Sequence, residues 1–410
     1  MSTVTAPSLG AQSEVGALRT VLVHRPDLAH ERLSPTNCHE LLFDDVMWVR
    51  RARQEFDAFV EVMREAHVEV LLLQDLLAET MQDAGGREWL LSRRLRPEEV
   101  TPVYSRELIA WMTELPAAEL ASRLTGGVTA GELPGEMGAL VRRAMRPTDF
   151  VIAPLPNHLF ARDTSAWIYG GVSINPMSRP GRQHESLNLE AVYRFHPRFR
   201  AAEFPIWFGG VDHDWGGATL EGGDVMPVGE GVLLVGHGER SNARAASILA
   251  QNLFAAGAAR LVIGAQMPRD ATSLHLDSVL AFCSRGLVTA RGPVVSRIVP
   301  ILYTPDGHGG VHAELSTRTF LEEVQDALGL EHLSIVATGG DEFPAEPNQW
   351  DDGTNVVALA PGVVVAYERN EATNAKLQRA GVEVHAIAGQ ELARGRGGTH
   401  SLTCPITRGA

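Results

Sequence analysis

One pattern recurs four times after residue 160, and it restricts the folds open to this chain more than any other feature. In each copy a polar residue precedes an apolar strand, a turn that contains glycine and a second apolar strand. The copies begin at Asp163, Asp224, Asp277 and Asn355, which are spaced by 61, 53 and 78 residues. Internal repeats at such spacings are typical of radial or stacked arrays of one unit.

A helix and a closing strand complete the repeat. The stretches GHGERSNARAASIL and AYERNEATNAKL both lead to a helix through Glu-Arg and Asn, and the strands RLVIG and VEVHAI follow them. Near the N-terminus, a strand over 18–24, an amphipathic helix over 43–66 and a strand over 68–73 provide a further unit. We therefore expect about five ββαβ-like units in a closed ring, which leaves few sheet edges exposed and directs the polar residues toward one axis.

The stretch between about residues 76 and 146 has a different character. It contains LLAETMQDAG, REWLLSRRL, SRELIAWMTEL and GEMGALVRRAM, with almost no runs of β-branched residues. We interpret it as four or five helices in a compact insert. The predicted organisation is a ring formed by residues 1–75 and 147–410, with a helical insert at 76–146 and the functional site in the second part of the ring.

Charge and lysine content exclude several classes of function. The chain has 36 basic and 50 acidic residues and a formal net charge of −14, which disfavours nucleic acid and anionic membranes as partners. Lys376 is the only lysine. The chain therefore has no Gly-Lys-Ser/Thr phosphate loop, and a pyridoxal enzyme could use no other lysine.

Cysteine usage and the N-terminus indicate the compartment. Cys38, Cys283 and Cys404 have no paired spacing for zinc and are odd in number for disulfides. The N-terminal residues do not form a signal-peptide pattern, and no stretch approaches the ~18 apolar residues of a membrane span. We expect a reduced, cytoplasmic protein that acts on a small molecule and uses no cofactor.

Polar residues gather where the repeats begin. The groups are Asn157–Asp163, Glu221–Asp224, His275–Asp277 and the glycine-rich Arg394–Pro405. Because alternate residues of an extended segment point to one side, the histidine and the aspartate of the third group are expected to face one cavity. Taken singly, each acid could cap a turn, the histidine could be structural and the arginines could form surface ion pairs. Their recurrence at equivalent places of a repeat favours a functional site.

These motifs resemble those of the arginine deiminases, a family of the guanidino-modifying (pentein) superfamily, over essentially the whole chain. Seven motifs in the family's order make the resemblance specific. They are LLFDD (Leu41–Asp45), PNHLFARD (Pro156–Asp163), NPMSRPGR (Asn175–Arg182), LEGGD (Leu220–Asp224), GHGERSN (Gly236–Asn242), HLD (His275–Asp277) and GRGGTHSLTCPITR (Gly395–Arg408). The resemblance implies an α/β fold, a five-bladed pseudo-symmetric α/β propeller with an inserted helical domain, in agreement with the repeats.

The resemblance also implies which residues perform the chemistry. Asp163 and Asp277 would hold the substrate guanidinium, because a planar cation with a fork of donors matches carboxylates bidentately. Glu221 and His275 would form the proton relay, in which the histidine protonates departing ammonia and later activates water. Two carboxylates beside the cation keep its carbon electrophilic.

Five further residues are implied to bind the rest of the substrate. Arg182, Arg240 and Arg396 would bind the α-carboxylate, with hydrogen bonds from Asn157 nearby. Phe160 would pack on the aliphatic arm. These carboxylate-binding positions favour L-arginine over agmatine, which has no carboxylate.

The nucleophile position departs from the family pattern. In arginine deiminases the glycine-rich loop ends in histidine followed by the catalytic cysteine. Its thiolate attacks the guanidinium carbon, expels ammonia and leaves an alkylthiouronium that water converts to citrulline. Here His400 is followed by Ser401. A serine hydroxyl is a far poorer nucleophile than a thiolate, and no base to activate it is obvious in the sequence. The first step should therefore be severely slowed.

Three explanations of Ser401 are open. The serine is a deliberate replacement that gives an inert, substrate-trapping form of a deiminase. Alternatively, the chain is a natural pseudoenzyme that binds arginine or a relative as a sensor. In the third explanation Cys404 attacks after the loop rearranges, although its place before Pro405 is more typical of a structural thiol.

A metal-dependent ureohydrolase is the less favoured alternative, and the state of assembly is predicted from the resemblance. Asp212–Asp214 resembles a fragment of the acid–histidine–acid motif of dimanganese ureohydrolases, which also act on guanidines. The further carboxylate pairs that would hold two metals are not found in the sequence, so we expect no metal. Relatives of the resembled family commonly form dimers or higher assemblies, which implies a homo-oligomer.

Overall fold

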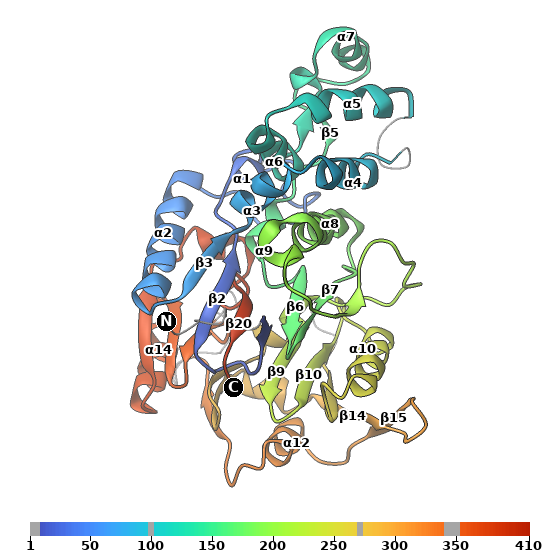
Figure 1. Cartoon of the computed structure of the whole chain (residues 1–410). Coiled ribbons are helices and arrows are strands. Elements are labelled where there is room, and N and C mark those ends of the chain that lie inside the picture. The colour runs from blue at the N-terminus through green and yellow to red at the C-terminus, as the bar shows by residue number, and fades with distance from the viewer. Residues whose placement is uncertain (1–8, 97–101, 269–273, 340–352) are drawn as a thin grey trace, which may run out of the picture.

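Five of the six sheets found in the described residues are built to one plan (Figure 1). The computed structural model describes residues 9–96, 102–268, 274–339 and 353–410, and it has a mixed α/β structure. In each sheet two strands run antiparallel, a helix follows, and a third strand returns parallel to the second. The predicted strand–turn–strand–helix–strand repeat is therefore found in the described residues.

Four of these sheets are formed by consecutive segments of the chain. Their strands are β6 (Ser165–Ile168), β7 (Gly171–Ile174) and β8 (Ile206–Gly209); β9 (Val225–Gly229), β10 (Val232–His237) and β11 (Leu261–Gln266); β12 (Leu280–Ser284), β13 (Leu287–Ala290) and β16 (Ser334–Ala337); and β17 (Val357–Ala360), β18 (Val363–Tyr367) and β19 (Glu383–Ile387). The hairpin β14 (Val299–Pro305) and β15 (Val311–Leu315) extends the second sheet beyond β11.

The fifth sheet joins the two ends of the chain. Strand β20 (Cys404–Arg408) runs antiparallel to β2 (Leu18–Val23), and β3 (Glu69–Leu72) lies parallel to β2. On the other edge of β20, the short β1 (Gly10–Ala11) pairs with it in parallel. Strand β20 thereby lies between two N-terminal strands.

Helices connect and cover the sheets. The longer ones are α2 (Val49–Glu65), α8 (Pro180–Phe195), α10 (Ala243–Ala255), α12 (Phe320–Ala327) and α14 (Glu371–Arg379), and the short ones are α1 (Leu28–Glu31), α9 (Pro197–Arg200) and α11 (Gly292–Val295). Their starts follow local chemistry: Pro180 occupies the first turn of α8, and Asn242 accepts a hydrogen bond from Ala245 N at 3.1 Å to cap α10.

Helices dominate the chain between β3 and β6. They are α3 (Leu73–Thr80), α4 (Ala84–Arg94), α5 (Pro102–Glu114), α6 (Ala117–Gly126) and α7 (Gly135–Ala144), with a small sheet of β4 (Val128–Thr129) and β5 (Phe150–Ile152). Figure 1 shows α4 to α7 grouped at one end of the molecule.

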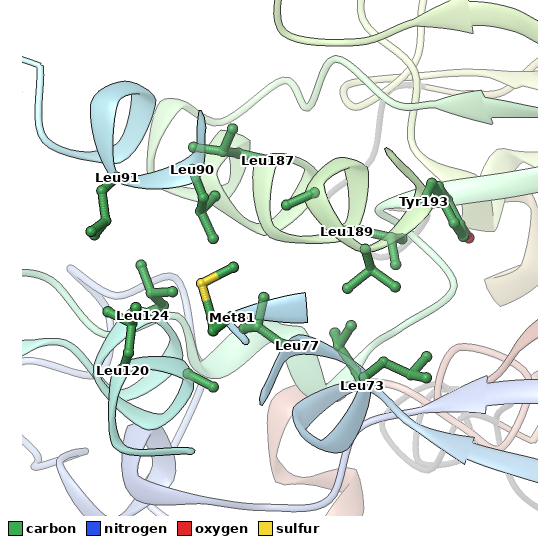
Figure 2. Packing of buried hydrophobic residues seen from close by; sticks show 14 of the residues in the cluster. Leu73, Leu77, Met81, Leu90, Leu91, Leu120, Leu124, Leu187, Leu189 and Tyr193 are labelled. Carbon is green, nitrogen blue, oxygen red and sulfur yellow. The ribbon is translucent and has the colours of Figure 1, made fainter. Parts of the chain in front are cut away.

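A leucine-rich core joins these helices to α8 (Figure 2). In α3, Leu73 and Leu77 lie four residues apart and so share one face, and both are fully buried. Leucines of α4 and α6 and residues of α8 meet this face, namely Leu90, Leu91, Leu120, Leu124, Leu187, Leu189 and Tyr193. Helix α8 therefore has one side in the helical core and is connected to β7 and the site described below.

The structure corrects one predicted element. The strands expected at 18–24 and 68–73 are β2 and β3, but the helix expected over 43–66 begins only at Val49. Phe43 is buried against other rings instead: it stacks on Phe160 at 6.2 Å and meets His30 edge-on at 5.8 Å. The apolar spacing in the sequence extends before Val49 because Phe43 is also buried, but against rings outside α2. In the part of the chain described, we find no helix both long and apolar enough to cross a membrane.

Candidate active site

A cavity of about 80 Å³ opens where the first strands of several sheets begin. Nine of the ten predicted site residues line it: Asn157, Phe160, Asp163, Arg182, Arg240, His275, Asp277, Arg396 and Ser401. The tenth, Glu221, lies behind His275 and is hydrogen-bonded to it. The structure therefore brings the ten candidate residues together, nine at the cavity and one directly behind it.

Short 3-10 turns position the acids and the histidine. They are η2 (Pro156–Leu159), η3 (Gly222–Asp224) and η4 (Leu276–Ser278), each immediately before or close to a first strand. Two of these turns approach closely, because a Cβ added at Gly223 would lie 2.9 Å from Cγ of His275. Glycine is required there for the histidine to pack against the turn.

His275 is placed between two carboxylates. Its Nε2 lies 2.8 Å from Oε2 of Glu221, and its Nδ1 lies 3.8 Å from Oδ1 of Asp163. Burial alone would lower the pKa of His275, but the charge of Asp163 and the hydrogen bond to Glu221 outweigh it and raise the pKa to about 10. Burial likewise opposes ionisation of Glu221, but the hydrogen bond and charge of His275 lower its pKa to about 2. At neutral pH the pair is an imidazolium and a carboxylate.

Asp224 supports this pair from behind. Its Oδ1 accepts a hydrogen bond from the backbone N–H of Leu276 at 2.8 Å, and its Oδ2 accepts one from Oγ of Ser241 at 2.6 Å. Burial raises the pKa of Asp224 to about 7. Asp224, the head of its repeat, thus fixes the turn that presents His275 and does not line the cavity itself.

Ser401 is hydrogen-bonded to two of the polar residues that begin the repeats. Its Oγ donates to Oδ2 of Asp277 at 3.0 Å and accepts from Nδ2 of Asn355 at 3.0 Å. Burial opposes ionisation of Asp277, but its hydrogen bond with His400 lowers the pKa. A carboxylate with a lowered pKa is a weak base, so the hydroxyl of Ser401 keeps its proton. The structure therefore provides a hydrogen-bond acceptor for Ser401 and no strong base.

A buried chain of charges continues from Asp277 to the N-terminal segment. Nδ1 of His400 lies 3.0 Å from Asp277, and Nε2 lies 2.7 Å from Oε2 of Glu14. Burial opposes ionisation of Glu14, but Arg162 and His400 lower its pKa to about 2. The sequence analysis missed Glu14, because it precedes the repeats and belongs to none of the seven motifs.

Arg182 lies among carboxylates at the base of the cavity. Its guanidinium contacts Oδ2 of Asp163 at 2.9 Å, and Oε2 of Glu185 at 2.9 Å. Oε2 of Glu221 is 3.5 Å away. Burial would lower the pKa of Arg182, but these carboxylates raise it, so the side chain is charged. Asp163 therefore already holds one guanidinium in this structure. Glu185, one helical turn from Arg182 in α8, is a further partner that the sequence analysis did not single out.

Arg240 and Arg396 lie in more exposed parts of the cavity. Arg240 approaches Oε2 of Glu221 at 3.5 Å, while Nε of Arg396 lies 2.9 Å from Oδ2 of Asp44. Arg396 has a left-handed backbone with φ of 62° at the end of η5 (Leu392–Gly395). The LLFDD loop that contains Asp44 thus closes against the glycine-rich loop.

Asn157 and Phe160 attach the same loop to the site. The amide of Asn157 donates to the carbonyl oxygens of Leu41 and Leu42 at 3.1 and 3.0 Å. A Cβ at Gly397 would lie 2.2 Å from the ring of Phe160, so the glycine-rich loop needs glycine to pass over it.

Cys404 is placed away from the cavity. Its Sγ lies 3.5 Å from Oγ of Ser165, and it is not among the residues that line the cavity. Burial raises the pKa of this thiol. The thiol is therefore protonated and buried, as expected of a structural cysteine.

Metal ligation was tested at two places. Asp163, Glu221 and His275 bring ligand atoms within 4.8 Å of one another, the one such group found in the described residues. The guanidinium of Arg182 contacts both of these carboxylates, so the group is better suited to organic cations than to a metal ion.

The acid–histidine–acid stretch does not converge on one point. Asp212 forms ion pairs with Arg93 and Arg194, His213 packs against Trp215, and Asp214 accepts from the backbone of Gly216. This arrangement does not resemble a metal centre.

The fold matches that of guanidino-modifying enzymes. DDAH from Pseudomonas aeruginosa, a mutant complexed with citrulline, aligns with a TM-score of 0.53 and 15% identity over 95% of this chain and 100% of that chain. The N-terminal domain of ArgZ, a cyanobacterial arginine dihydrolase, aligns with a TM-score of 0.53 and 14% identity over 95% and 98%. SxtG, an amidinotransferase from Microseira wollei, aligns with 0.55 and 13% over 98% of each chain. These neighbours share the fold of this chain.

The family follows from the sequence itself. The model of the arginine deiminase family matches residues 39–408. The chain belongs to the arginine deiminase family, which confirms the resemblance noted from its motifs. Membership supports an enzyme that acts on carbon–nitrogen bonds.

Proposed function

We propose that this site is built to hydrolyse L-arginine to L-citrulline and ammonia, and that the chain with Ser401 binds arginine without turning it over at an ordinary rate. The single observation that supports this most is the grouping of Asp163, His275, Asp277 and residue 401 around one cavity. The family match supplies the reaction class. The proposal divides into a binding step and a chemical step.

In the binding step, Asp163 and Asp277 accept hydrogen bonds from the substrate guanidinium. Both are buried carboxylates, with side chains 4% and 1% exposed, so the cation is desolvated and its charge is matched. The positive charge stays on the guanidinium and its carbon remains electrophilic. Phe160 provides an apolar wall for the aliphatic arm.

In the chemical step, a cysteine thiolate at position 401 attacks the guanidinium carbon. The bond to the departing nitrogen breaks as the imidazolium of His275 gives its proton to that amino group. The group leaves as ammonia, and an alkylthiouronium remains on the cysteine. Neutral His275 then takes a proton from water, and the hydroxide adds to the same carbon. The carbon–sulfur bond breaks as the added hydroxyl gives its proton to solvent, which releases citrulline and restores the thiolate and the imidazolium. Glu221 stabilises His275 whenever the histidine is protonated.

Serine at position 401 interrupts this sequence at its first step. An alcohol is nucleophilic only with a base to remove its proton, and Asp277, whose pKa is lowered, is a weak one. Two of the structural neighbours, DDAH with citrulline and ArgZ with its substrate, are mutants with serine in place of cysteine. We therefore favour an inactive, ligand-binding form, with a natural arginine-binding pseudoenzyme as the alternative.

The α-carboxylate of the substrate is assigned to Arg240 and Arg396, with Arg182 as a third cation close to both ends. Arg240 and Arg396 line the cavity with side chains that are 14% and 29% exposed, whereas that of Arg182 is 5% exposed and contacts three carboxylates. We therefore expect Arg240 and Arg396 to reorient toward a substrate carboxylate more readily than Arg182. Citrulline in DDAH supports a ligand of this size and type.

We extend the proposal to architecture and assembly. The five sheets would close as blades around the axis through the cavity, with residues 76–146 as an insert between ring segments 1–75 and 147–410. A cytoplasmic homo-oligomer is expected from the resemblance to the family. Sedimentation velocity gives the mass of the assembly, and a single species with the mass of one chain would contradict the oligomer.

Product analysis tests the reaction class. The Ser401→Cys variant is incubated with arginine, and citrulline, ammonia and ornithine are quantified. Citrulline and ammonia in equal amounts support hydrolysis, whereas ornithine formed only with an added amine supports amidino transfer. Ser401→Ala, which cannot form the covalent intermediate, is the matched control. A Ser401→Cys variant that binds arginine without forming any product would favour the pseudoenzyme.

A further inference from the structure

A second, larger cavity of about 280 Å³ lies between α4, α8 and the loop over residues 210–219 that follows β8. Figure 1 shows α4 and α8 as neighbours at the junction of the helical end and the sheets. His213 and Asp214 of the acid–histidine–acid stretch line this cavity, which we call the α4–α8 cavity. The proposed function makes no use of these residues.

The floor of the α4–α8 cavity is apolar and buried. Its side chains include Ile174, Met177, Leu187 and Ala218, each at most 3% exposed. Trp215 adds an aromatic wall, packed against the ring of His213 at 4.5 Å. A floor of this kind suits the hydrocarbon or ring of an organic molecule, and the volume suits a small metabolite.

The rim of the α4–α8 cavity is cationic. Arg93 and Arg96 at the end of α4 face it, and His213 faces it from the loop. Within the part of the chain that the structure describes, Arg96 forms no ion pair and His213 forms no hydrogen bond. The one acid of the lining, Asp214, already accepts from the backbone N–H of Gly216 at 2.8 Å. In a chain with a net charge of −14, this excess of donors is a local feature and does not follow from composition.

We propose that the α4–α8 cavity binds a small organic anion, with its apolar body on the floor and its carboxylate or phosphate toward Arg96 and His213. The guanidinium of arginine is suited to both groups through charge-assisted hydrogen bonds, and an imidazole N–H can donate a further hydrogen bond. The guanidinium of Arg93 also adds positive charge to the rim, and it is already paired with Asp212 at 2.8 Å.

The α4–α8 cavity shares a wall with the active site. Pro176 lines it and accepts a hydrogen bond from the backbone N–H of Leu220 at 3.1 Å. Two residues further on, Ser178 donates from its N–H and its Oγ to Oε1 of Glu221 at 3.2 and 3.0 Å. A ligand in the cavity therefore contacts the segment that positions Glu221, while remaining separate from the arginine site.

Calorimetric titration with three probes of one shape tests the proposal. The probes are phenylacetate, its neutral amide and phenyl phosphate, at constant ionic strength so that general screening is equal. At least one of the two anions is expected to bind about tenfold or more tightly than the amide, because a charge-assisted hydrogen bond is worth that much. The tighter of the two anions identifies the group as carboxylate or phosphate.

Three variants locate the binding. Arg96→Gln and His213→Gln are each expected to weaken the anion about tenfold. Arg285→Gln is the matched control, since this exposed arginine pairs with Glu230 elsewhere on the surface, and it should leave binding unchanged. The proposal is overturned if the amide binds as tightly as the anions, if neither cavity variant weakens binding, or if no probe binds at millimolar concentration.

Discussion

The two ends of the active-site cavity differ in burial and in support. At the end assigned to the guanidinium, the side chains of Glu221, Asp163 and Asp277 are 0%, 4% and 1% exposed, and each is in contact with at least two other polar groups. At the end assigned to the carboxylate, Arg240 and Arg396 are 14% and 29% exposed.

We interpret this difference as a division between the residues of the chemical step and the residues that recognise the substrate. Buried charges must be matched by neighbours, so the acids are fixed by an extended network that holds His275 in its charged form. The two arginines are on loops, where side chains can move to meet a ligand. We therefore expect changes at the buried end to affect folding and binding strongly, and changes at the exposed end to affect selectivity.

Arg182→Ala should produce the largest loss of stability. Removing this guanidinium leaves the carboxylates of Asp163, Glu185 and Glu221 buried without their shared cation. Loss of one partner of a buried pair costs about 3–5 kcal/mol. Urea unfolding measures the free energy. Arg25→Ala, which removes a two-pronged pair with the exposed Asp57, is the control and should cost at most about 1 kcal/mol. Equal losses of stability in the two variants would show that the buried ion pairs of the site contribute no more than an exposed pair.

Asp163→Asn should weaken arginine binding by about 100-fold, since two charge-assisted hydrogen bonds to the substrate are lost. Calorimetry on the chain with Ser401 measures this without turnover. Asp45→Asn changes an acid of the neighbouring loop that pairs with Arg394, and its binding should match that of the unchanged chain. Unaltered affinity in Asp163→Asn would assign the guanidinium to another place.

The buried ion pair predicts a pH dependence of stability. The pKa of His275 is raised from 6.5 to about 10, so its contribution is full below pH 6.5 and is lost as the pH rises through 10. The pKa of Glu221 is lowered from 4.5 to about 2, so its contribution is full above pH 4.5 and is lost as the pH falls through 2. Unfolding of His275→Gln, compared with the unchanged chain, should show the largest deficit between pH 4.5 and 6.5, of roughly 3 kcal/mol, and a smaller one at pH 10. A deficit that grows toward pH 10 would contradict the charged pair.

At the exposed end the expected effects are smaller and selective. Arg240→Ala should weaken arginine binding by roughly 10-fold and leave agmatine binding nearly unchanged, because agmatine has no carboxylate. Arg396→Ala should act in the same direction but less, since this side chain is more exposed. Parallel calorimetry with both ligands measures the ratio. Equal losses for arginine and agmatine would make these arginines structural.

The sequence predicted the repeat because it is built from local patterns. Strand pairs, turns and the placement of Asp163, Asp277 and His275 before strands can be recognised in a window of a few residues. The start of α2 was predicted six residues too early, since burial of Phe43 against Phe160 is a contact between distant segments.

Partners supplied by distant segments could not be predicted either. Glu14 reaches His400 across 386 residues, and no pattern near either residue indicates it. The position of Arg182 beside Asp163 also had to be seen in three dimensions, since the same arginine on another rotamer or helix face would meet a substrate carboxylate. The sequence therefore supplied the candidate site residues, and the structure showed which of them are paired with one another.

The most direct test of the account is a comparison of turnover and binding at position 401. Arginine affinity is measured by calorimetry for the chain with Ser401, and citrulline release is measured for that chain and for Ser401→Cys. We predict similar arginine affinity in the two proteins and a turnover number at least about 10³-fold higher with cysteine, because only the thiolate can form the covalent intermediate. Citrulline release at an ordinary rate by the chain with Ser401, or no gain with Ser401→Cys despite arginine binding, would contradict it.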